Sequence, residues 1–82
     1  MRKNKKVGDY EVWELSVKEM MPIMRILNDD ANEGQLHLIG TAVKQKGESI
    51  GYEVAGEMGM SQYISLASEV AAINGLDSEG ND

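Results

Sequence analysis

Apolar and polar positions alternate along the chain mostly at helical spacing, and the clearest helix signal follows residue 15. Ser16 is a favoured N-cap residue, and Glu19, three positions later, completes a capping box. Leu15 and Met20 occupy the two positions of a hydrophobic staple, which fixes the direction from which the chain enters a helix. The pattern therefore predicts a helix that begins at Val17.

One face of this expected helix is apolar at the 3.6-residue period and is assigned to the core. Its members are Val17, Met20, Met21, Met24 and Leu27. Pro22 follows the first turn, removes one backbone hydrogen bond and is expected to kink the helix. Ile23 lies at the edge of the apolar face. Ile26 points away from it and is expected to be exposed.

Two further helical segments are predicted after a turn over residues 28–34. A second helix over about residues 33–46 carries an inward stripe and is expected to stop at Gly47, which suits the C′ position. The stripe consists of Leu36, Ile39, Ala42 and Val43, with Leu38 beside it. Gly40 is expected to weaken this helix. A short helical piece is expected around Ile50–Met58.

The last helix is expected to be capped by Ser61 and to present a stripe at helical spacing. The stripe consists of Tyr63, Leu66, Ala67, Val70 and Ile73. The sequence "NGL" at residues 74–76 then predicts a stop, with Gly75 in a left-handed conformation. Leu76 is expected to fold back as in a Schellman motif.

The two ends of the chain carry no helical pattern. Residues 1–8 are predicted to form a flexible basic arm, and residues 77–82 an acidic disordered tail. The segment "DYEVWEL" is rich in strand-forming residues and is expected to be extended, with a short strand as one interpretation. No clear second strand is available to pair with it, so the alternative is that it lies along the helices. The predicted fold is mainly α: a single helical domain over residues 9–76, a small bundle of three to four short helices with an extended N-terminal segment.

Composition limits the core and the setting of this 82-residue chain. Apolar residues make up 41% of the sequence, phenylalanine and cysteine are absent, and six residues are methionine. The core is therefore expected to consist of Met, Leu, Ile, Val and Ala, and disulfides and thiolate chemistry are excluded. No signal peptide is visible, and no apolar run is long enough to span a membrane. A reducing cytoplasm fits these features.

The net charge of −6 is unevenly distributed. Four of the eight basic residues lie in the predicted arm, and the rest of the chain is strongly acidic. An acidic body repels nucleic acid phosphates, so no nucleic acid partner is expected. The arm is interpreted as a solubilising segment, with phosphate binding as the alternative.

No group of residues suggests catalysis or a cofactor. His37 is the single histidine and lies opposite the apolar side of its expected helix, so it is interpreted as a plain surface residue. The oxygen-rich segment "NDDANEG" lacks the glycine and glutamate spacing of a calcium loop. A helix-turn-helix alignment of residues 54–70 would bury Ser65 and Ser68, which argues against it. We expect no enzyme activity, no metal and no cofactor.

The segment "EMMPIM" leaves two interpretations open. Its methionines either fill a core that lacks phenylalanine, or form an adaptable apolar surface for a partner helix. In the second interpretation, the isoleucines extend the apolar patch onto the surface. The candidate partner-binding residues are Met20, Ile23, Met24 and Ile26.

The overall layout resembles that of the small tail assembly chaperones of long-tailed, siphovirus-like bacteriophages. The resemblance is carried by "YEVWELSVKEMMPIM", by the glycine-interrupted middle and by "EVAAINGLDSEGND". It spans about residues 10–82 and rests on short motifs.

The resemblance implies a non-enzymatic protein in the host bacterial cytoplasm. Such a protein binds the long, mostly helical tape measure protein and keeps it soluble during tail assembly, and the tail tube protein is a further expected partner. Self-association is compatible with this role. The alternative is a small acidic regulator that inhibits another protein by protein–protein binding, for which the acidic body is the supporting feature.

Overall fold

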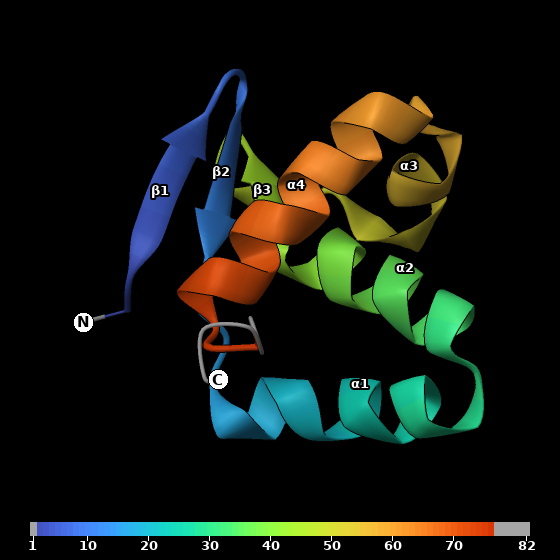
Figure 1. Ribbon diagram of the computed structural model, residues 1–82. Coiled ribbons are helices and arrows are strands. Elements are labelled where there is room, and N and C mark those ends of the chain that lie inside the picture. The colour runs from blue at the N-terminus through green and yellow to red at the C-terminus, as the bar shows by residue number, and fades with distance from the viewer. Residues whose placement is uncertain (1, 77–82) are drawn as a thin grey trace.

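The computed structural model describes residues 2–76, which form four helices and a four-stranded antiparallel sheet (Figure 1). The structure has four helices, within the expected three to four, but the expectation of a mainly α bundle is only partly correct. Two β-hairpins were not predicted, and they build one side of the core. The predicted acidic tail, residues 77–82, lies outside the described residues.

The first hairpin corrects the prediction of a flexible arm. Strand β1 (Asn4–Val7) pairs with β2 (Tyr10–Trp13) in antiparallel register. Gly8 has a φ of +62° and is the first of the two residues that connect them, the position where a type II′ turn requires glycine. The basic segment is therefore an edge strand, and its Lys5 reaches Glu69 at 2.8 Å.

The second hairpin shortens the predicted second helix. Helix α2 (Ala31–Ala42) ends before β3 (Val43–Gln45), which pairs with the two-residue strand β4 (Glu48–Ser49). Lys46 and Gly47 both have positive φ, 55° and 84°, as a type I′ turn requires. Gly47 therefore turns a hairpin and does not end a helix.

The predicted start of the first helix is confirmed. Helix α1 (Val17–Asp29) begins with the complete capping box: the Ser16 hydroxyl accepts from the Glu19 amide at 3.1 Å, and the Glu19 carboxylate accepts from the Ser16 amide at 2.8 Å. Pro22 lies inside the helix. The predicted turn over residues 28–34 is much tighter than expected, because Asp30 alone separates α1 from α2 and caps α2 by accepting from two of its amides.

Two buried glycines of α2 allow other backbones to approach it closely. A Cβ at Gly34 would lie 2.5 Å from the Cα of Leu27 in α1. A Cβ at Gly40 would lie 2.6 Å from the carbonyl carbon of Gly51, at the start of α3. These glycines therefore set how closely α1 and α3 pack against α2, and Gly40 has a packing role that outweighs its low helix propensity.

The last two helices follow the predicted pattern closely. Helix α3 (Gly51–Glu57) confirms the short helical piece, and α4 (Met60–Ile73) ends in the predicted Schellman motif: the amide of Leu76 donates to the Ala71 carbonyl at 2.8 Å. Gly75 has a φ of +71°. The predicted cap at Ser61 is wrong, because Gly59 precedes the helix and no side chain caps it.

The core lies where α4 crosses the sheet and α2 packs beside it (Figure 1). Val12 and Val43 are paired on neighbouring strands, and both are fully buried. The buried core residues are Val12, Ile23, Leu38, Ile39, Ala42, Val43, Ala55, Leu66 and Val70. Methionine is missing from this set, so the expectation that methionines fill the core is wrong for residues 2–76.

Candidate functional site: an exposed methionine face on α1

The outer side of α1 carries a stripe of exposed apolar side chains. Val17 is 78% exposed, Met21 46% and Met24 54%. With the exposed Asn28 they are spaced by four, three and four residues, so they form one line along the helix. We call Val17, Met21, Met24 and Asn28 the α1 seam.

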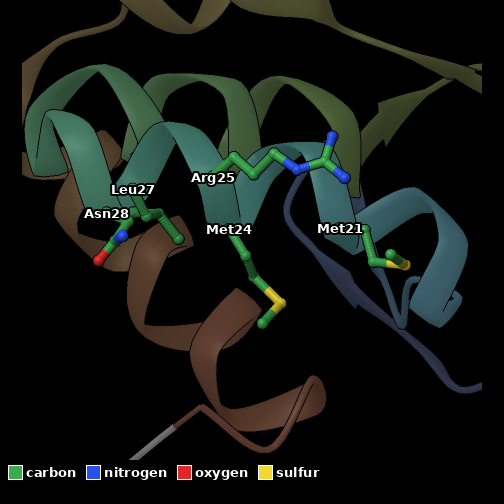
Figure 2. Close-up of a pocket in the computed structure, with 5 residues that line it drawn as sticks. All are labelled: Met21, Met24, Arg25, Leu27 and Asn28. Carbon is green, nitrogen blue, oxygen red and sulfur yellow. The ribbon is translucent and has the colours of Figure 1, made fainter.

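The α1 seam borders an open hollow of about 610 Å³ (Figure 2). Its lining among the described residues comes from α1 alone: Met21, Met24, Arg25, Leu27 and Asn28. Figure 2 shows the side chains of Met21 and Met24 projecting from the helix, with their sulfur atoms away from its axis. Such a wide, open surface suits an elongated apolar partner better than an enclosed small molecule.

The structure revises which residues of "EMMPIM" are available to a partner. Ile23, expected at the edge of the apolar face and on the surface only in the partner-binding interpretation, is 5% exposed and belongs to the core. Met20 and Ile26 are half-buried, and Met20 packs against the core. Met24, assigned to the centre of the buried face, is one of the exposed residues. Of the four candidate residues, Met24 alone lies on the α1 seam.

The predicted buried face of α1 is therefore only partly correct: Met20 and Leu27 pack against the core, whereas Val17, Met21 and Met24 are exposed. Apolar residues cover more than half of its circumference, so their spacing alone does not fix which side is buried. Gly34 determines which side of α1 is buried, because its missing side chain lets the backbone of α2 approach α1 at Leu27. This contact covers the side of α1 that carries Leu27 and Ile23. No local sequence signal marks Val17, Met21 and Met24 as exposed, because their spacing fits a buried stripe equally well.

Two cations border the α1 seam on its open side. Lys18 and Arg25 are exposed, and each directly follows a seam residue. Among residues 2–76 the ion pairs are Arg2–Glu19 and Lys5–Glu69, so neither Lys18 nor Arg25 takes part in one. At the start of the helix, the hydrogen bond from the Ser16 amide and the nearby Arg2 lower the pKa of Glu19.

A second apolar surface lies between α2, α3 and the start of α4. It is a groove of about 270 Å³ lined in part by Leu36, Met58, Met60 and Tyr63. Met60 is 68% exposed, and burial raises the pKa of Tyr63. From Gly47 to Leu76 the chain contains no lysine or arginine, so the charges around this groove are acidic.

His37 is not the plain surface residue that was expected. It is half-buried, and its ring lies 4.7 Å from that of Tyr52 between the ring centres. The Tyr52 hydroxyl donates to both oxygens of Glu33, at 2.9 and 3.0 Å, and this bond raises the pKa of Tyr52. The cluster ties α3 to α2.

Within the described part of the chain, no group of three or more histidine, cysteine or acidic residues is placed to hold a metal ion. None of its helices combines the length and the apolar character needed to cross a membrane. Comparison with protein-family models, with curated proteins and with solved structures found no match. The function is therefore inferred from the surface chemistry of the chain itself, above all from the α1 seam.

Proposed function

We propose that this protein is a non-enzymatic tail assembly chaperone of a long-tailed bacteriophage. In this role it binds the tape measure protein in the host bacterial cytoplasm and keeps it soluble until the tail tube protein assembles around it. The observation that carries the proposal is the α1 seam, an apolar stripe with two exposed methionines on a well-capped helix. The resemblance of residues 10–82 to tail assembly chaperones supplies the identity of the partner.

The physical case rests on what an exposed methionine stripe can bind. Methionine side chains are flexible and polarisable, so they fit apolar partners of varied shape. A tape measure protein offers many different helical segments, and a chaperone for it must accept more than one of them. Helix-in-groove binding, with anchors at three- and four-residue spacing, matches the line of Val17, Met21 and Met24.

The rest of the fold supports this role by holding α1 rigid. The capping box fixes its first turn, and the close approach at Gly34 fixes its inner side against α2. A helix that is already ordered loses little conformational entropy when a partner binds. The exposed stripe is therefore ready for binding without prior rearrangement.

A second candidate function is a small acidic regulator that inhibits another protein. The observation that favours it is the absence of basic residues from Gly47 to Leu76. Gene position separates the two functions. A chaperone gene is expected directly upstream of the very long reading frame of a tape measure protein, whereas a place among early regulatory genes favours the regulator.

The proposal is tested by co-expressing the protein with that downstream tape measure protein and measuring how much soluble complex is recovered. Met21→Asp and Met24→Asp place a charge where the partner must desolvate it, so both are expected to reduce recovery strongly. Met60→Asp is the matched control, because Met60 is also an exposed methionine, 68% against 46% and 54%, but lies on α4. Full recovery with both α1 variants, or equal loss with Met60→Asp, would contradict the proposal.

A further inference from the structure

We infer that the segment which docks on α1 is an amphipathic helix whose apolar line is bordered by carboxylates on the side of Lys18 and Arg25. This inference rests on the proposed function and adds to it the chemical class of the partner segment. It follows from how the two sides of the α1 seam differ in charge and burial.

One side of the seam is partly covered by the protein itself. Met20 and Leu27 border it there, seven residues apart, and both are half-buried and packed against the core. A docked helix can therefore extend its contacts beyond the seam mainly toward the other side.

That other side carries a repeated positive charge. Lys18 and Arg25 are also seven residues apart, so they occupy equivalent positions along the seam, and both are exposed. In two-helix packing, charged residues at such bordering positions select the partner by opposite charge. Asp29, the last residue of α1, is the acidic residue at the far end of this side.

The charge pattern also argues against a second copy of this chain as the occupant. In an antiparallel pair of two copies centred on Met21 and Met24, Lys18 of each copy would lie beside Arg25 of the other. The pair would therefore contain two contacts between like charges. Like charges at these positions destabilise helix pairing. In a parallel pair the cationic border would meet the side that the protein itself already partly covers.

The net charge of −6 does not oppose an acidic partner at contact. At physiological salt the field of exposed charges is largely screened beyond about 8 Å. The charges nearest the docked helix therefore decide the interaction, and on the open side of the seam Lys18 and Arg25 outnumber Asp29.

The experiment is co-expression of the tape measure protein with the double variant Lys18→Glu/Arg25→Glu. Its matched control is Lys6→Glu/Lys46→Glu, which changes the net charge equally at two exposed lysines on the hairpins, outside α1. Reversing both border charges replaces two attractions by two repulsions. The α1 double variant is expected to lower the yield of soluble complex roughly tenfold, and the control to leave it unchanged.

The outcomes separate the inference from the proposed function. Complex formation that survives the α1 charge reversal but is lost with Met24→Asp would overturn the inference and leave the proposed function intact. Equal loss in both double variants would overturn it as well, because net charge would then be responsible. No complex with the unaltered protein would contradict the proposed function itself. Concentration-dependent dimerisation of the isolated protein, abolished by Met24→Asp in sedimentation velocity, would assign the seam to a second copy and overturn the inference.

Discussion

The side chain of Asn74, at the end of α4, holds the backbone of Leu15, just before α1. Its Oδ1 accepts from the Leu15 amide at 2.7 Å, and its Nδ2 donates to the Trp13 carbonyl at 3.2 Å. One amide group therefore connects the end of the last helix to the link between the sheet and α1. Since Ser16 caps α1 one residue later, Asn74 also fixes where that helix begins.

Asn74→Ala is expected to destabilise the protein by about 1–3 kcal/mol, because it leaves the half-buried Leu15 amide without a partner. In a domain of this size, each kcal/mol lowers the melting midpoint by roughly 4–8 °C. Thermal melting followed by circular dichroism measures the change. Asn32→Ala is the control, because Asn32 is exposed and its side chain makes no hydrogen bond among the described residues. An equal midpoint for the two variants would mean that the Asn74 contacts do not hold the helix.

The capping box predicts a pH dependence of stability through Glu19. In the folded protein the pKa of Glu19 lies below the ordinary value of 4.5. Between the pKa of the folded state and that of the unfolded state, the unfolded chain therefore binds more protons. The stabilisation is therefore present above about pH 4.5 and is lost as the pH falls through the pKa of the folded state. Glu19→Gln keeps an acceptor for the Ser16 amide but carries no charge. It is expected to melt below the unaltered protein at pH 7, and the gap is expected to close as the pH falls below the pKa of Glu19 in the folded state. A gap that stays constant with pH would show that the charge of Glu19 has no part in it.

Local signals predicted the helices better than the sheet. The capping box at Ser16 and the glycine stop at Gly75 depend on neighbouring residues alone, and both are confirmed. Strand β1 is a short run of polar and basic residues that becomes a strand only by pairing with β2. The Gly8-Asp9 pair is a hairpin signal that the prediction of a flexible arm overlooked.

The second hairpin, formed by β3 and β4, could not be predicted from the sequence for a different reason. The apolar stripe of α2 continues from Ala42 into Val43 without a break, so helical spacing gave no reason to stop there. Val43 is buried because it pairs with Val12, thirty-one positions earlier in the chain. Such long-range pairing leaves no signal in the neighbouring sequence. The exposed face of α1 was likewise decided by Gly34, on another helix.

Gly40, one of the two buried glycines of α2, gives a prediction for which Gly56 in α3 serves as the control. Gly40→Ala places a methyl group 2.6 Å from the Gly51 carbonyl carbon, so α3 must shift, and the expected cost is about 1–3 kcal/mol. Gly56→Ala adds the same methyl group in α3 where the nearest atom is 3.9 Å away. Its expected effect is a gain of about 0.5–1 kcal/mol from better helix propensity. Urea denaturation midpoints distinguish the two, and a gain at both positions would show that α3 does not pack closely on Gly40.

Two neighbouring residues of α1 test which of its sides is buried. Ile23 is 5% exposed and Met24 is 54% exposed. Ile23→Asp forces a carboxylate into the core without a pairing group, a change expected to unfold the domain or lower its midpoint by more than 10 °C. Met24→Asp leaves its charge in water and is expected to change stability by no more than about 0.5 kcal/mol. Thermal melting of the two purified variants measures both effects under the same conditions. The opposite result, with Met24→Asp unfolded and Ile23→Asp stable, would mean that the methionines face the core and would remove the surface on which partner binding depends.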